Sequence, residues 1–243
     1  MAAMTARSVV LSVLLGAHPA WASVSELIRL TADFGIKETA LRVALTRMVS
    51  GGDLIRSADG YRLSDRLLAR QARQDEAMRP RVRPWQGNWH LVIVTSVGTD
   101  ARTRAALRTT MHDKRFAELR EGVWLRPDNL DLELAADVAE RVRVLTARDD
   151  APAELAGQLW DLTEWAGVGD RLLGEMAEMA EAADIPGQFA LAAAMVRHLL
   201  SDPMLPEELL PAKWPGAQLR SAYHDFATEL AKRRGTNQLL EAK

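Results

Sequence analysis

The chain has 243 residues, 48% of them hydrophobic, so it is long enough to form two or three small domains with sizeable cores. It has no cysteine, which excludes disulfides, thiolate metal sites and cysteine nucleophiles. The net charge of −2 is unevenly distributed: residues 35–85 carry 11 Lys/Arg and 6 Asp/Glu, whereas residues 150–243 carry 8 and 15. The basic segment suits nucleic-acid phosphates, and the acidic C-terminal part suits a ligand or partner domain better.

The first predicted element is a helix over residues 5–16, with an apolar stripe from Val10 to Leu15. The same region is also typical of a secretory signal, because Arg7 precedes an apolar run and Ala20-Trp21-Ala22 follows it. We favour the helix, since cleavage would remove the first part of a module that continues in register, and we expect a cytoplasmic protein. No other apolar run approaches the roughly 20 residues that span a bilayer.

Two more helices and a hairpin are predicted next. Ser23-Val24-Ser25-Glu26 fits a capping box, which predicts the start of the second helix. Gly35 permits a sharp turn before the third helix, which runs from Glu38 to Ser50 and ends at a Gly-Gly pair. Two short apolar runs, 54–57 and 61–63, flank an Asp-Gly turn, which is a typical hairpin signal.

This order of elements predicts a winged helix-turn-helix, in which one helix enters the major groove of DNA and the hairpin lies on the backbone. Apolar residues recur along one side of the third helix, and basic and hydroxyl residues occupy another. Arginine pairs with guanine and threonine bonds bases, whereas the alternative interpretation is a surface helix with solvated charges. The DNA-binding residues that we expect are Lys37, Thr39, Arg42, Thr46, Arg47, Arg56 and Arg62.

The sequence pattern of the rest of the chain predicts two further regions. After a helical linker, strands near 90–95, 122–126 and 143–146 alternate with helices over 101–111 and 134–141, which suggests a ferredoxin-like α+β domain. The C-terminal part is helical; its predicted helices are 154–166, 170–183, 187–201 and 218–233. We therefore predict a mostly α fold with α+β character, divided into a winged helix-turn-helix (1–65), a linker (66–84), a ferredoxin-like domain (85–150) and a helical ligand and dimer domain (151–243).

These residues resemble the PaaX-type repressors of phenylacetate degradation. The resemblance rests on motifs spread over almost the whole length: Phe34-Gly35-Ile36 with the following helix, Tyr61-Arg62-Leu63, the Trp85 and Trp89 pair, and the stretch from Asp202 to Gly216. It implies a homodimer, a middle domain similar to the small ferredoxin-like nuclease of CRISPR adaptation, and relief of repression by an aryl-CoA thioester. Two departures are Lys37, where a helix-capping Ser or Thr is expected, and a single C-terminal tyrosine, Tyr223.

Tryptophan is the most abundant aromatic residue, with seven against four phenylalanines and two tyrosines. Trp160 and Trp165 suit a pocket for an aromatic acyl group or an adenine ring, although tryptophans at helical spacing are more often core residues. Arg171, Arg197 and His198 suit the phosphates of CoA, with solvated surface charge as the alternative. These five residues form the predicted site for an acyl-CoA effector.

The sequence predicts no cofactor, no metal site and no enzyme activity. None of the five histidines has the spacing of a helical metal site, and no nucleophile elbow or phosphate loop is present. The alternative function is a metal-dependent nuclease built on the middle domain, for which Asp100 is the first available carboxylate. A third possibility is a protein-interaction module. The favoured hypothesis is a dimeric, ligand-responsive repressor that binds double-stranded operator DNA away from any membrane.

Overall fold

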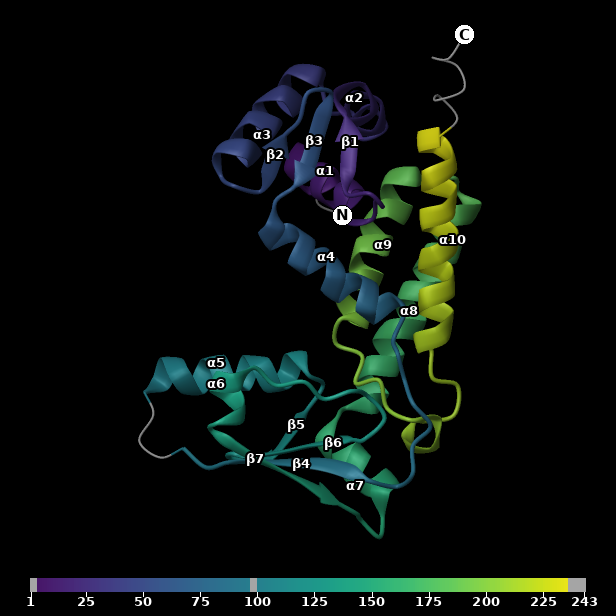
Figure 1. Cartoon of the computed structure of the whole chain (residues 1–243). Coiled ribbons are helices and arrows are strands. Elements are labelled where there is room, and N and C mark those ends of the chain that lie inside the picture. Colours follow the sequence, from purple (N-terminus) through teal and green to yellow (C-terminus); the bar gives the residue numbers. More distant parts are fainter. Residues whose placement is uncertain (1–3, 97–99, 236–243) are drawn as a thin grey trace. The chain divides into compact units, whose positions relative to one another are not determined.

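The computed structural model describes residues 4–96 and 100–235, which divide into two compact units. The first unit takes the chain up to Arg79 together with residues 169–200 and the chain from 216 onward, and the second takes residues 80–168 and 201–215. Helices and two small antiparallel sheets make the fold mixed α/β (Figure 1). No helix in the described part of the chain is long and apolar enough to cross a bilayer.

The first unit contains six whole helices of the described chain, the later turns of a seventh, and a three-stranded sheet. Its elements are α1 (Ala6–Leu15), β1 (Trp21–Ser23), α2 (Val24–Ala32), α3 (Glu38–Ser50), β2 (Leu54–Arg56), β3 (Gly60–Leu63), α4 (Asp65–Met78), the later part of α8 (Leu162–Glu181), α9 (Ile185–Leu199) and α10 (Gly216–Gly235).

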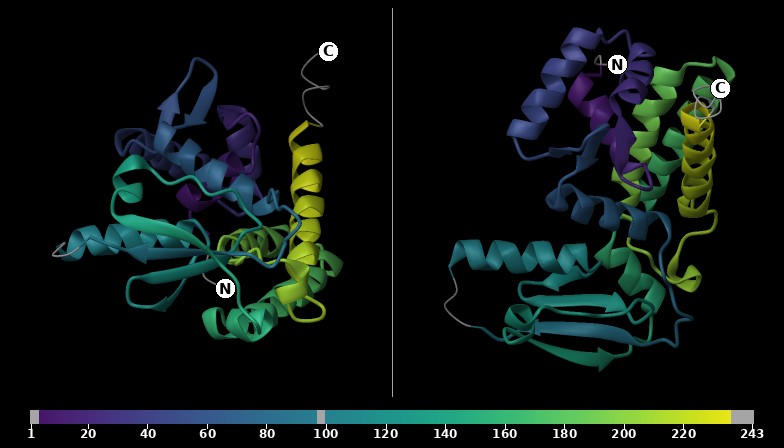
Figure 2. Two further views of the ribbon diagram at one scale, coloured as in Figure 1. Left: turned by 60° about the horizontal axis from the view of Figure 1, so that its bottom comes forward. Right: turned by 45° about the horizontal axis from the view of Figure 1, so that its top comes forward.

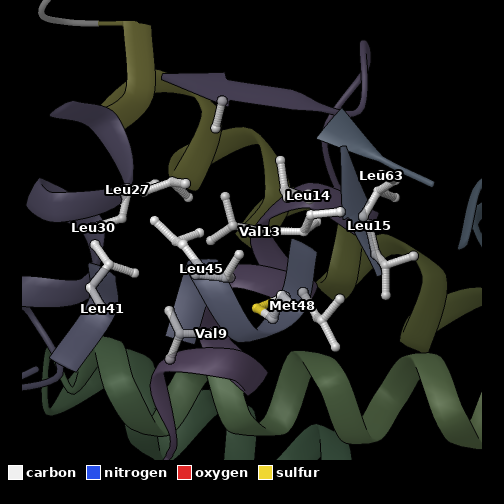
Figure 3. Close-up of a cluster of buried hydrophobic side chains, with 14 of the residues drawn as sticks. Val9, Val13, Leu14, Leu15, Leu27, Leu30, Leu41, Leu45, Met48 and Leu63 are labelled. Atoms are coloured by element: carbon white, nitrogen blue, oxygen red, sulfur yellow. The ribbon is translucent and has the colours of Figure 1, made fainter. Parts of the chain in front are cut away.

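The core of this unit lies where α1, α2 and α3 meet. α1 is almost entirely buried, and its Val9, Val13 and Leu14 pack among leucines of α2 and α3 (Figure 3). Met48 of α3 and Leu63 of β3 close the same cluster. Because the apolar residues of α3 recur every three or four positions, burying them leaves the opposite side of that helix in solvent.

Two buried polar side chains join α1 to α4. Asp53, in the turn after α3, accepts hydrogen bonds from Arg7 of α1 at 2.9 Å and from Arg66 of α4. Gln71 of α4 donates from Nε2 to the carbonyl oxygens of Leu14, Leu15 and Ala17 at 3.3, 3.0 and 2.9 Å. The last carbonyls of a helix have no intrahelical partner, so Gln71 supplies a donor to carbonyl groups at and just after the end of α1.

The hairpin β2–β3 gains a third strand from the segment before α2. β1 pairs antiparallel with β3, which gives the order β1-β3-β2. Gly60 lies so close to the backbone of Ala22 that a Cβ atom at this position would overlap the Ala22 carbonyl group. Trp21 donates from its indole nitrogen to Ser57 Oγ at 3.0 Å, which fixes the tip of the hairpin to β1.

The second unit is built on a four-stranded sheet with the order β5-β6-β4-β7, in which all neighbours are antiparallel. Its elements are β4 (Trp89–Val94), α5 (Ala101–Asp113), β5 (Ala117–Arg120), β6 (Val123–Pro127), α6 (Ala136–Ala139), β7 (Val142–Ala147), α7 (Pro152–Leu159), the start of α8 and the 3-10 helix η1 (Glu207–Leu209).

Both faces of this sheet are covered. Val92 and Trp124 point to the face that packs against Met111 of α5 and Val138 of α6. Their neighbours in β4 and β6 point to the other face, where Trp89 and Leu125 pack with α7 and with residues 205–210. In the right-hand view of Figure 2, the strands of this sheet lie beneath α5.

Several sequence predictions match the structure and several are wrong. α3 begins and ends as predicted, and Ser23 caps α2 by accepting from the Glu26 amide at 3.1 Å. The helices expected over 154–166 and 170–183 are wrong, because the break falls at Trp160-Asp161 and α8 continues through Gly167 and Gly169. The helix expected over 134–141 shrinks to Ala136–Ala139. The strands β1 and β5 were not predicted.

Candidate DNA-binding surface

The exposed side of α3 carries most of the polar residues that the sequence singles out. Lys37 is the N-cap residue, in extended conformation, and its side chain makes no cap hydrogen bond. Thr39, Arg42, Thr46 and Arg47 are all exposed along the helix. The first amides of α3 therefore lack a side-chain acceptor, and the helix dipole adds positive potential at the same end.

Two interactions order this side of α3. Arg42 pairs with Glu38, one turn earlier, through an Nη2–Oε1 distance of 2.6 Å. Thr46 donates its hydroxyl to the Arg42 carbonyl oxygen at 3.0 Å, so its oxygen can still accept a bond from outside. Both partners of the ion pair are at least half exposed, and such pairs contribute little to stability, so Arg42 can exchange Glu38 for another anion at small cost.

The hairpin supplies two further cations. Arg56 ends β2 and Arg62 lies in β3, and both side chains are exposed. The register pairs Arg62 with Ile55 and Arg56 with Tyr61. Neither arginine, nor Lys37 or Arg47, forms an ion pair within residues 4–96 and 100–235. The structure thus presents uncompensated charge on α3 and on the hairpin of one compact unit, which is an arrangement suited to phosphates.

The predicted effector residues fall into two groups. Trp160 and Trp165 belong to the second unit: Trp160 stacks on Trp89 with centroids 6.4 Å apart, and Trp165 stacks on Trp214 at 4.3 Å. Trp165 also donates to Ser201 Oγ at 3.2 Å. Trp160 also lines a pocket between α7 and residues 208–211. The volume of this pocket is about 610 Å³.

The other three predicted effector residues belong to the first unit. Arg171 is exposed in α8, and His198 is half-buried near the end of α9. Arg197 lines an apolar pocket that α1, α4, α9 and α10 enclose. Sequence reasoning did not place Ser12, Arg70, Gln74 and Tyr223, the other polar residues of this pocket, at a common site, because the pocket joins four helices that lie far apart along the chain.

Asp100, the carboxylate considered for a nuclease, is a helix cap. Its side chain accepts from the Thr103 amide at 2.8 Å and from the Thr103 hydroxyl at 3.2 Å. These hydrogen bonds lower the pKa of the carboxyl group. Within the described residues, no group of three or more His, Asp or Glu side chains is placed to hold a metal ion.

The comparisons with known proteins agree with these features along the chain. Three family models match in succession: "PaaX-like protein" at residues 5–67, "PaaX protein central Cas2-like domain" at 82–157 and "PaaX-like protein C-terminal domain" at 160–238. A curated relative, the transcriptional repressor PaaX of Escherichia coli (strain K12), is 29% identical over 224 residues, which cover 81% of this chain and 70% of the relative.

A solved structure is closer in sequence. The uncharacterized protein Rv0674 from Mycobacterium tuberculosis is 78% identical, with a TM-score of 0.85, and the match covers 96% of this chain and 99% of the other. The curated relative indicates the class of transcription regulators. Because the three models together follow almost the whole chain, it belongs to the PaaX family.

Proposed function

We propose that this protein is a ligand-responsive repressor that binds operator DNA through a winged helix-turn-helix. The observation that carries the proposal is the exposed basic side of α3 beside two exposed arginines of the hairpin. In this proposal α3 enters the major groove, where Arg42, Thr46 and Arg47 read base edges. Lys37 and Thr39 meet phosphates at the start of the helix, and Arg56 and Arg62 meet the backbone beside it.

The remainder of the predicted organisation belongs to the same proposal. The element order from β4 to β7 and the strand order β5-β6-β4-β7 support a ferredoxin-like middle domain within the segment 85–150. We propose the boundaries 1–65, 66–84, 85–150 and 151–243, a homodimer that reads a palindromic operator, and action in the cytoplasm, where the DNA partner is found.

We propose that an aryl-CoA thioester releases the DNA. The family membership supports an acyl-CoA ligand, and Trp160, Trp165, Arg171, Arg197 and His198 remain the proposed contacts. The test is binding of the purified protein to the DNA upstream of its own gene, titrated with phenylacetyl-CoA at fixed salt. Sequence-specific binding that the thioester releases supports the proposal. Specific binding that ignores the thioester removes this effector, and absence of specific binding removes the repressor.

Arg42→Ala tests the reading side of α3. We expect a loss of about 1–3 kcal/mol in binding to the specific site, with much less effect on random DNA, because a bidentate contact to a base is lost. Arg73→Ala is the matched control, since Arg73 is an exposed arginine of α4 outside the proposed surface. Equal specific affinities for the two variants would show that Arg42 does not read bases.

A further inference from the structure

An apolar pocket in the first unit has the features of a small-molecule site. It lies between α1, α4, α9 and α10 and has a volume of about 120 Å³. Phe189 and Val196 of α9 and Phe226 and Leu230 of α10 supply apolar walls. A closed cavity of ~150 Å³ lined by apolar side chains holds one benzene molecule, so this slightly smaller, partly open pocket suits a group no larger than a six-membered ring.

Polar groups converge on the same pocket. Arg70 of α4 and Arg197 of α9 line it, and both guanidinium groups lack an ion pair or hydrogen bond within the described chain. Tyr223 of α10 also lines it, with its hydroxyl oxygen beside Gly16 at the end of α1. Two cations and a phenol at the rim of an apolar pocket are complementary to a carboxylate that carries an apolar group.

The phenol of Tyr223 is a proton donor at neutral pH. Burial raises its pKa above the ordinary value, and the negative charge of Asp75 adds to the effect. A neutral hydroxyl can donate to a carboxylate oxygen while the arginines balance the charge. A ligand without a charge would leave the two guanidinium groups uncompensated, so the pocket favours an anion over its neutral analogue.

The walls of the pocket connect to the proposed DNA-reading helix. The ring of Phe189 meets the ring of Phe34 edge-on, with centroids 5.1 Å apart. Phe34 stands at the turn that leads into α3, immediately before Gly35. α4 contributes Arg70 and Gln74 to the same pocket, and its Gln71 donates to carbonyl oxygens at the end of α1. An occupant that displaces Phe189 therefore acts on Phe34 beside α3, and one that displaces α4 acts on α1, whose residues share a core cluster with those of α3.

We propose that this pocket is an effector site for a small free carboxylic acid with a ring-sized apolar group, and that its occupation changes the affinity for DNA through the Phe189–Phe34 contact. The site is separate from the contacts proposed for the thioester except for Arg197. The regulatory half of this inference rests on the proposed DNA-binding function, whereas the ligand-binding half does not.

The ligand-binding half is tested with 4-fluorobenzoate as the probe, titrated against the full chain and followed by ¹⁹F NMR. We expect saturable binding, a loss of about tenfold or more in the double variant Arg70→Gln, Arg197→Gln, and loss of binding in Ala227→Leu, which fills the pocket from α10. Arg73→Gln and Ala217→Leu are matched controls on α4 and α10, because both residues are exposed and lie outside the pocket.

Three results of the same titration would contradict the proposed site. Binding that survives Ala227→Leu in a folded protein places the probe elsewhere. Equal binding of 4-fluorobenzyl alcohol, the neutral analogue, contradicts the role of the two arginines. Binding of 4-fluorobenzoyl-CoA without binding of the free acid shows that the ligand is the thioester and overturns the proposal. Thermal melting of each variant establishes that it is folded.

The regulatory half is tested by measuring DNA affinity with and without 4-fluorobenzoate. We expect the acid to change the affinity of the wild-type protein by at least about tenfold, and to leave that of Phe34→Leu nearly unchanged although the acid still binds. Acid binding with no specific DNA binding removes the proposed function and keeps the site. Specific DNA binding that is indifferent to bound acid keeps the proposed function and overturns the regulatory half.

Discussion

The two N–H groups of the Gln71 amide are shared among three backbone carbonyl oxygens at the end of α1. Gln71 is only 6% exposed, so the carbonyl groups that it contacts lie away from bulk water. It also joins α4 to the helix that forms the centre of the first core, so the polar contact and the apolar packing depend on each other. A substitution at this position that keeps the size of the side chain but removes its amide therefore has a large effect on stability.

We expect Gln71→Leu to lower the free energy of unfolding by about 1–3 kcal/mol, because carbonyl groups that remain buried lose their donor. Urea unfolding of the full chain measures the change. Gln218→Leu, at an exposed position of α10, serves as the control and should stay within about 0.5 kcal/mol of the wild type. Equal midpoints for the two variants would mean that the carbonyls of α1 find other donors.

His90 gives the second unit a dependence on pH. Burial lowers its pKa below the ordinary value, and Arg126 and Arg83 act in the same direction, while the negative charge of Asp128 opposes them. The Nε2 atom lies 3.0 Å from Asp128 Oδ1, and this carboxylate favours the protonated ring. Burial is the largest of these effects, and the folded protein favours the neutral imidazole.

We expect stability to fall as the pH decreases below about 6.5, because the unfolded chain then binds the proton that the folded state disfavours. The loss continues until the pH reaches the lowered pKa of the folded state. Urea unfolding at pH 7.5 and pH 5.5 gives the difference, and His90→Gln should make it smaller. A variant whose pH dependence equals that of the wild type would assign the effect to other groups.

At the scale of the element, long periodic segments were predictable from the sequence and short or interrupted ones were not. α3 was predictable because its apolar spacing, its glycine stop and its cap region agree. β1 has three residues and exists because Gly60 lets its backbone approach β3. The break between α7 and α8 arises from an extended Trp160 and from Asp161, which accepts the Glu164 amide at 2.9 Å. Both the Asp161 cap and the nearby glycines, Gly167 and Gly169, are sequence signals of a helix boundary. Tertiary packing determines which of them ends the helix.

The exposed residues of the candidate surface were predictable for the same reason, since they follow from the periodicity of one helix and one hairpin. The pocket was not predictable. Val13, Arg70, Phe189 and Tyr223 come from four helices, and their meeting depends on contacts between residues more than 100 positions apart. Local pattern carries no information on such contacts.

Two glycines provide a matched test of close packing. Gly60→Ala places a Cβ atom against the Ala22 carbonyl group, so we expect β1 to separate from β3 and the melting temperature to fall. Gly174→Ala lies in α8 with nothing within 4 Å of the new atom, and should raise the stability by about 0.5–1 kcal/mol. Thermal melts of both variants measure the effects. A harmless Gly60→Ala would contradict the tight β1–β3 contact.

At the scale of the whole molecule, the charge distribution matters more than the net charge. The chain is slightly acidic, yet its basic excess lies within residues 35–85, which include α3, the hairpin and α4. The acidic excess lies beyond residue 150. The number of counterions released from DNA depends on how many cationic side chains contact its phosphates, and not on the net charge of the protein. A protein of negative net charge can therefore still bind DNA with an affinity that falls steeply with salt concentration.

We expect the logarithm of the DNA-binding constant to fall linearly with the logarithm of the salt concentration. Arg56→Gln and Arg62→Gln should each make the slope shallower by about 1 and weaken binding to all sequences alike. Arg143→Gln, at an exposed position of β7 in the second unit, is the control. Unchanged slopes in both hairpin variants would remove the hairpin from the phosphate contacts, as would a loss confined to the specific sequence.

The division of the chain has a consequence for biosynthesis. The first unit is assembled from three separate stretches, and the core around α1 includes Phe189 of α9 and is packed against by Phe226 and Leu230 of α10. A ribosome releases α1 to α4 early, but these helices acquire their last packing partners only after residue 230 has emerged. In the second unit, in contrast, all four strands of the sheet are available once β7 has been synthesised. The proposed DNA-reading unit is therefore the last to be completed, and a prematurely terminated chain lacks part of the core that supports α3.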